Sequence, residues 1–157
     1  MVKVEDLNGK VIIITGGGGA IGSAMAKQFA ANGAKVVVAG RTAATLHEVV
    51  DSIREAGGEC AAIITDVSDK KSAEDMVAKT VELYGRLDCL VNNAGINGGV
   101  EDRKPIHEYN DDLWQRIINV DLNGVYYCSK PAIKQMEKQG FGGNIINIGS
   151  IVGLTPL

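Results

Sequence analysis

The most constraining feature of this 157-residue sequence is a regular alternation between short apolar runs and longer amphipathic stretches. Five runs have the β-branched content of buried strands, and they span residues 10–15, 34–40, 59–65, 86–93 and 142–150. Strands that alternate with helices form a parallel sheet with right-handed crossovers. Runs that are apolar throughout are typical of strands with helices on both faces. We therefore expect an α/β fold, with a doubly wound parallel sheet.

The helices between these strands are predicted from their boundary residues. Thr42 and Ser68 precede the second and third helical stretches, where their hydroxyl groups favour N-caps. The fourth stretch, residues 110–139, begins with an Asn-Asp-Asp run that suits the positive end of a helix dipole. It reads as one long helix, which Gly124 and Pro131 can bend.

Composition and charge exclude several classes of protein. A formal net charge of −3 provides no basic surface for nucleic acid. We expect no membrane partner, because no apolar run approaches membrane-spanning length, and the polar N-terminus does not resemble a signal peptide. The three cysteines, Cys60, Cys89 and Cys128, are widely spaced, which argues against a disulfide framework or a zinc site and favours the cytoplasm. We expect no metal, and a single domain over residues 1–157.

The segment TGGGGAIG, residues 15–22, joins the first strand to the first helix. Gly16 permits a tight turn, Gly18 and Gly19 allow a ligand to approach the backbone, and Gly22 allows the helix to pack closely on the strand. The N–H groups of the helix N-terminus can then bind a pyrophosphate. A merely flexible turn is the structural alternative, and a P-loop is excluded because no Gly-Lys-Ser/Thr follows.

The pattern Thr-Gly-x-x-x-(Gly/Ala)-x-Gly in this position resembles the short-chain dehydrogenase/reductase family. The tetrapeptide NNAG (92–95) resembles its second signature, beside the cofactor, and Asp66-Val67 its adenine-contacting pair. Asn119 and Ser150 match two of its catalytic positions. The resemblance implies a Rossmann-like fold with strand order 3-2-1-4-5 and makes this chain the dinucleotide-binding domain of an enzyme.

The end of the second strand bears on the choice of nicotinamide cofactor. NAD-preferring folds usually place a carboxylate here for the ribose hydroxyls, but this sequence has Gly40 followed by Arg41. A guanidinium can pair with a 2′-phosphate, and the hydroxyl of Thr42 can add a hydrogen bond. We therefore favour NADP(H). NAD(H), with Arg41 in solvent or stacked on adenine, stays open as the alternative. The predicted cofactor-binding residues are Gly16, Gly18, Gly19, Ile21, Gly22, Arg41, Thr42, Asp66, Val67, Asn93, Ala94 and Gly95.

The catalytic group implied by the resemblance is incomplete in this sequence. The counterpart of Ser150 holds the substrate oxygen and that of Asn119 orders a relay water, while a Tyr-x-x-x-Lys motif, normally a little over a dozen residues beyond the serine, handles the proton. The chain ends at Leu157, before that point. A literal match, Tyr126 with Lys130, lies upstream of the serine strand, and we interpret it as a helix face. We expect the chain to be part of a longer protein whose C-terminal strands and helices are missing here.

Two functions follow. The first is an NADP(H)-dependent oxidoreductase that transfers a hydride between the nicotinamide and a small-molecule ketone or alcohol. The resemblance also implies a homo-oligomer, either a dimer or a tetramer. The second is a non-catalytic or truncated module that binds a nicotinamide dinucleotide.

Overall fold

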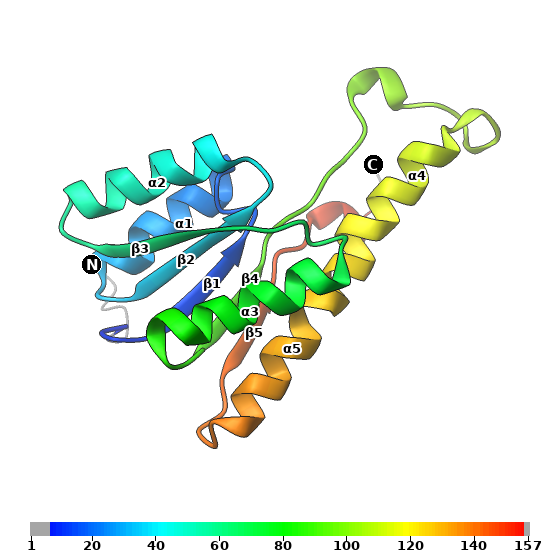
Figure 1. Cartoon of the computed structure of the whole chain (residues 1–157). Coiled ribbons are helices and arrows are strands. Elements are labelled where there is room, and N and C mark those ends of the chain that lie inside the picture. Colours follow the sequence, from blue (N-terminus) through cyan, green and yellow to red (C-terminus); the bar gives the residue numbers. More distant parts are fainter. Residues whose placement is uncertain (1–6, 156–157) are drawn as a thin grey trace.

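A computed structural model describes residues 7–155 as a five-stranded parallel sheet with helices on both faces (Figure 1). The strands have the order β3-β2-β1-β4-β5, and each neighbouring pair is parallel, as the resemblance implied. The strands are β1 (Val11–Thr15), β2 (Lys35–Gly40), β3 (Glu59–Ile64), β4 (Cys89–Asn92) and β5 (Asn144–Asn147). The longer helices are α1 (Ala20–Ala31), α2 (Ala43–Glu55), α3 (Lys70–Tyr84), α4 (Asp111–Ile117) and α5 (Gly124–Lys138).

Helices cover both faces of the sheet (Figure 1), and the core lies in two layers, one on each face. Successive side chains of a strand point to opposite faces, so Ile12 and Ile14 pack with α1 and α2, whereas Ile13 packs with α3 and α5. All three are 3% exposed or less. Burying a side chain of this size stabilises the fold by roughly 1.5–3 kcal/mol.

The strand β5 differs from the others because it lies at the edge of the sheet and is largely exposed. Ile145 packs against the layer that contains α3 and α5, but Ile146 is 43% exposed and Ile148, just after the strand, is 42% exposed. The expectation that helices cover both faces therefore applies to β1 and β2, whose residues are buried, and not to β5.

The stretch 110–139 is helical, but it is not one α-helix. Asn110 caps its start, with its side chain accepting a hydrogen bond from the N–H of Leu113 at 2.8 Å. Between α4 and α5 lies η3 (Ile118–Asn123), a segment of π-helix in which the N–H of Gly124 donates to the carbonyl of Asn119, five residues earlier. Two short 3-10 helices, η1 (Val100–Asp102) and η2 (Ile106–Glu108), precede α4, and a third, η4 (Ile151–Gly153), follows β5.

The structure corrects the predicted N-cap at Ser68 and shows Thr42 at its predicted position without a side-chain hydrogen bond. Asp69, not Ser68, caps α3, and its carboxylate accepts from the N–H of Ser72 at 2.6 Å. The hydroxyl of Ser68 instead donates to the carboxylate of Asp66. Thr42 does occupy the N-cap position of α2, but its side chain makes no capping hydrogen bond.

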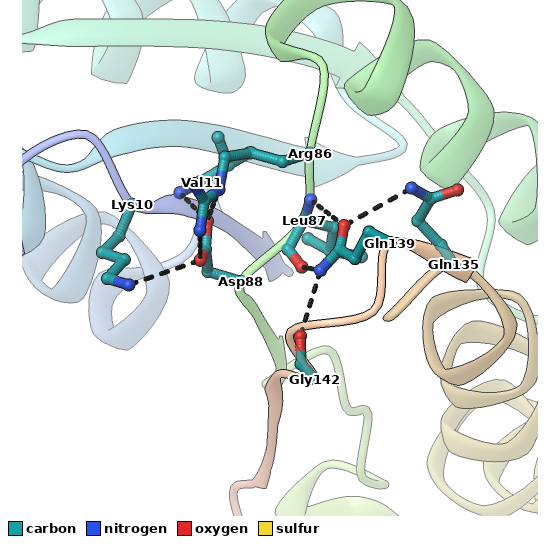
Figure 2. Close-up of polar contacts among 8 residues, drawn as sticks. All are labelled: Lys10, Val11, Arg86, Leu87, Asp88, Gln135, Gln139 and Gly142. Carbon is teal, nitrogen blue, oxygen red and sulfur yellow. Dashed lines mark hydrogen bonds and ion pairs between the residues drawn. The ribbon is translucent and has the colours of Figure 1, made fainter. Parts of the chain in front are cut away.

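Polar contacts surround Asp88 at the amino-terminal edge of the sheet (Figure 2). Asp88 is 8% exposed. Its carboxylate accepts from the Nε of Arg86 at 2.7 Å and from the N–H of Val11 at 2.9 Å, and it lies 3.6 Å from the ammonium of Lys10. Burial alone would raise the pKa of Asp88, but these donors hold that pKa below its ordinary value. Asp88 therefore stays ionised and joins the starts of β1 and β4.

A second contact at this edge comes from the side-chain amide of Gln139 (Figure 2). Its nitrogen donates to the carbonyl of Leu87 at 2.6 Å and to that of Gly142 at 3.0 Å, and its oxygen accepts from the N–H of Leu87 at 3.1 Å. The end of α5 is thereby tied to the segment that enters β4.

Candidate functional site

A cavity of about 390 Å³ lies at the opposite edge, where the parallel strands reach their carboxyl ends. Ligands bind at this edge in open α/β sheets, and the volume is in the range of small-molecule sites. Segments that follow β1, β2, β3 and β4 line it, together with one residue of η3. The lining residues are Gly16, Gly19, Ala20, Ile21, Gly22, Gly40, Arg41, Thr65, Asp66, Val67, Asn93, Ala94, Gly95, Ile96 and Val120.

The floor of the cavity is the glycine turn between β1 and α1. Gly16 has φ +64°, a left-handed conformation that favours glycine. A Cβ at Gly22 would overlap the carbonyl oxygen of Gly16 and come within 2.9 Å of the amide nitrogen of Asn93. Only glycine therefore lets α1 begin directly against the end of β1.

The N-terminus of α1 is arranged to receive an anion. Its N-cap residue is Gly19, no side chain caps the helix, and the next two residues, Ala20 and Ile21, line the cavity. By contrast, α3 is capped by Asp69. A helix N-terminus presents N–H groups and a positive dipole end, which suits a phosphate group.

The hydroxyl of Thr15 fixes the turn after β4 to the end of β1. This oxygen accepts from the N–H groups of Asn93 and Ala94, each at 3.0 Å, and donates to the carbonyl of Val91 at 3.3 Å. The side-chain amide of Asn93 returns a hydrogen bond to the carbonyl of Thr15 at 2.9 Å. Thr15 is 1% exposed, so these bonds form away from water.

Two of the predicted cofactor-binding residues lie outside the cavity lining. A Cβ at Gly18 would come within 2.5 Å of the hydroxyl of Thr45, so this glycine allows α2 to pack on the turn. The hydroxyl of Thr45 in turn donates to the carbonyl of Thr42 at 3.1 Å. Thr42 is exposed and does not line the cavity either. The other ten predicted cofactor-binding residues line it.

Arg41 and Asp66 stand on neighbouring strand ends at one side of the cavity. The carboxylate of Asp66 accepts from the hydroxyl of Ser68 at 2.6 Å and from its N–H at 2.9 Å. The Ser68 hydroxyl is the main cause that lowers the pKa of Asp66; burial opposes it, and the Ser68 N–H and the charge of Arg41 add to it. This side of the cavity therefore holds an exposed guanidinium and a fixed carboxylate.

The two predicted catalytic residues do not line this cavity. Asn119 lies in η3, where its side-chain oxygen accepts from Gln115 at 3.0 Å and from Asn123 at 3.1 Å. Ser150 is exposed beyond the carboxyl end of β5, and its carbonyl accepts from the N–H of Gly153 at 3.0 Å.

Asn92, at the end of β4, is hydrogen-bonded to the end of β5 and to α5. Its side-chain nitrogen donates to the side-chain oxygen of Asn147, at the end of β5, at 2.9 Å. It also donates to the hydroxyl of Ser129 in α5 at 3.0 Å. The ends of β4 and β5 and the helix after η3 are thereby held together.

The Tyr126–Lys130 pair lies on an exposed face of α5 and outside the cavity lining. The ammonium of Lys130 donates to the phenol oxygen at 3.3 Å, and Tyr126 is 58% exposed. This position agrees with the interpretation of the pair as a helix face.

Some lining residues had not been assigned to the cofactor site from the sequence. Thr65 and Ile96 follow β3 and NNAG directly, so their places at strand ends were a usable signal. Ala20 lies within the glycine segment itself. Val120 lines the cavity because of the path that η3 takes, and no local sequence pattern predicts that π-helical segment.

Residues 7–155 contain no group of three or more His, Cys, Asp or Glu side chains that could hold a metal ion. Over the same residues, none of the helices combines the length and the apolar character that crossing a membrane requires.

A comparison with models of known protein families shows which family this chain belongs to. The model of the short chain dehydrogenase family matches residues 10–157. The chain belongs to this family. The glycine turn and NNAG both lie within the matched residues, and the chain is similar to oxidoreductases.

Two curated relatives show the extent of the similarity. An uncharacterized oxidoreductase of Thermotoga maritima is 46% identical over 144 residues, which are 92% of this chain and 54% of that protein. The 3beta-hydroxysteroid dehydrogenase 2 of Eggerthella lenta is 35% identical and is matched over 94% of this chain and 56% of its own length. The chain thus spans about half the length of these curated relatives.

Solved structures agree with the fold. The crystal structure of an NAD+-bound xylitol dehydrogenase has a TM-score of 0.90 and 30% identity, covering 98% of this chain and 57% of that one. A short-chain type dehydrogenase/reductase from Mycobacterium marinum has a TM-score of 0.91 and 32% identity, covering 97% and 60%.

The contacts of Thr15 generate a prediction about stability. In Thr15→Val the shape of the side chain is kept, but the N–H groups of Asn93 and Ala94 lose their acceptor. We expect the free energy of unfolding to fall by about 2–4 kcal/mol, measured by urea denaturation.

Thr80→Val is the matched control. Thr80 is also fully buried, but its hydroxyl makes a single hydrogen bond, to the carbonyl of Met76 in its own helix, at 2.9 Å. We expect a loss below about 1 kcal/mol. Equal losses in the two variants would contradict the role assigned to Thr15.

Proposed function

We propose that the protein is an NADP(H)-dependent oxidoreductase that transfers a hydride between the nicotinamide and a ketone or alcohol. The observation that carries the proposal is the cavity at the carboxyl edge, with the uncapped N-terminus of α1 at its floor and Arg41 at one side. The names of the relatives, among them a hydroxysteroid dehydrogenase and a xylitol dehydrogenase, favour an alcohol–carbonyl reaction.

The residues of the cavity fit a dinucleotide phosphate. The diphosphate would meet the N–H groups of Ala20 and Ile21, at a helix N-terminus that no side chain caps. Beyond β2, Gly40 offers no carboxylate to repel a 2′-phosphate, and the exposed guanidinium of Arg41 can pair with it. NAD(H) remains the alternative, because the xylitol dehydrogenase structure is described as NAD+-bound.

The chemistry divides between the cofactor and the chain. When bound, the nicotinamide supplies or accepts the hydride. Ser150, beyond β5, would hold the substrate oxygen through its hydroxyl and so favour the charge that develops there. Asn119 would order water for proton transfer. Of the tyrosines in residues 7–155, none lines the cavity.

Oligomerisation is part of the same proposal. Four large apolar side chains on α4, η3 and α5 are exposed: Trp114, Leu122, Tyr126 and Ile133. Exposed apolar side chains that gather on one surface mark protein contacts. We propose a homo-oligomer that buries them. A cytoplasmic location stays a prediction from the cysteines, all three of which are free thiols.

Cofactor preference tests the role of Arg41. In Arg41→Ala we expect NADPH to bind about 10–100-fold more weakly, because charge-assisted hydrogen bonds to the 2′-phosphate are lost, while NADH binding is unchanged. Titration by cofactor fluorescence measures both. Arg116→Ala, which removes an exposed arginine from the last turn of α4, is the control. An unchanged preference in Arg41→Ala would remove the NADP(H) assignment.

Turnover distinguishes the enzyme from the binding module. We expect the full-length protein to oxidise NADPH over a panel of ketones, and Ser150→Ala to lower kcat by about 10²–10³-fold with NADPH affinity retained. Spectrophotometric assay at 340 nm follows the reaction. Clear NADPH binding without turnover of any ketone by the wild-type protein would instead support the non-catalytic module.

A further inference from the structure

The π-helical segment η3 and the residue directly after it are close to two segments that line the cavity. On one side, a Cβ at Gly124, the first residue of α5, would come within 2.9 Å of the side chain of Val67, so the junction of η3 and α5 passes close to the loop after β3. On the other side, Asp121 contacts the loop after β4. Between them, Val120 lines the cavity itself. Neither α4 nor α5 contributes a lining residue.

The contact of Asp121 is a hydrogen bond to the main chain. Its carboxylate oxygen accepts from the N–H of Ile96 at 2.9 Å, across 25 positions of the sequence. The same oxygen lies 3.7 Å from the place where a Cβ of Gly95 would stand. Gly95 and Ile96 both line the cavity, so the carboxylate contacts two neighbouring residues of its wall.

The wall that Asp121 holds has no regular structure of its own. Ile96 follows β4 and precedes η1, in a stretch without helix or strand. Upstream, the Thr15 hydroxyl fixes only the N–H groups of Asn93 and Ala94. The bond from Asp121 therefore extends the fixed part of the wall by two residues, from Ala94 to Ile96.

The same segment also carries Asn119. Its side-chain oxygen accepts hydrogen bonds from the side chains of Gln115 and Asn123. Its main-chain carbonyl accepts the π-type hydrogen bond from the N–H of Gly124. Asp121, two residues after Asn119, is thus the point where the segment that bears a predicted catalytic residue is tied to the cavity wall.

We propose that Asp121 is a positioning residue of the cofactor site. It holds the Gly95–Ile96 backbone against η3 and so fixes the cavity wall and Asn119 relative to each other. The proposal rests on the proposed function, since it assumes that the cavity binds a nicotinamide dinucleotide. Ile96 follows β4, and Arg41 follows β2 on the other side of β1, so the nicotinamide half would lie beside Ile96 if Arg41 holds the 2′-phosphate.

Three variants of the full chain test the proposal. Asp121→Ala removes the acceptor, and we expect the Kd for NADPH to rise about three- to tenfold and the Ile96 amide to exchange its hydrogen faster by a similar factor. Asp121→Asn keeps an acceptor oxygen at the same place, and we expect both quantities to stay within about twofold of the wild type. Asp112→Ala removes an exposed carboxylate from the first turn of α4 and serves as the matched control.

The two readouts separate this inference from the proposed function. Hydrogen exchange at Ile96 is measured without cofactor, so it tests the bond from Asp121 even if the wild-type protein binds no NADPH, a result that would contradict the proposed function alone. Unchanged exchange and unchanged NADPH affinity in Asp121→Ala would overturn the inference. So would an Asp121→Asn variant as impaired as Asp121→Ala, because a charge and not an acceptor would then be required.

Discussion

The close approach of α1 to the end of β1 is the constraint on which the rest of the structure depends. It exists because Gly22 has no side chain to overlap the carbonyl of Gly16, and because Gly16 adopts a left-handed conformation. The helix N-terminus then opens onto the carboxyl edge of the sheet with no side chain of its own in front of it. The amide of Asn93 packs into the same corner and carries the constraint to β4.

The two edges of the sheet differ in what their polar groups contact. At the amino-terminal edge, Asp88 and Gln139 make direct hydrogen bonds to the main chain of neighbouring segments (Figure 2). At the carboxyl edge, Thr15 fixes the backbone but leaves the first turn of α1 and the guanidinium of Arg41 facing the cavity. A fixed backbone favours binding, because hydrogen-bond donors that are already in position lose little conformational entropy when the ligand binds.

Much of this arrangement could be predicted from the sequence, since it follows from local patterns. The alternation of strands and helices follows from the spacing of apolar runs, and the strand order was implied by the family resemblance. Ten of the twelve predicted cofactor residues line the cavity, and they belong to motifs that stand at strand ends. Other features depend on contacts between distant segments. Gly18 packs beneath Thr45, and η3 forms where Gly124 passes Val67 and Asp121 reaches Ile96. No residue pattern within the stretch 110–139 marks the π-helical turn, so one continuous helix was the natural expectation.

The central claim is that the glycine turn seats the diphosphate of a nicotinamide dinucleotide at the N-terminus of α1. A crystal structure of the protein with NADPH tests it most directly. The account predicts diphosphate oxygens about 2.7–3.2 Å from the main-chain nitrogens at the start of α1, with the 2′-phosphate beside Arg41. A dinucleotide bound elsewhere on the protein, or a diphosphate held away from that helix end, would contradict it.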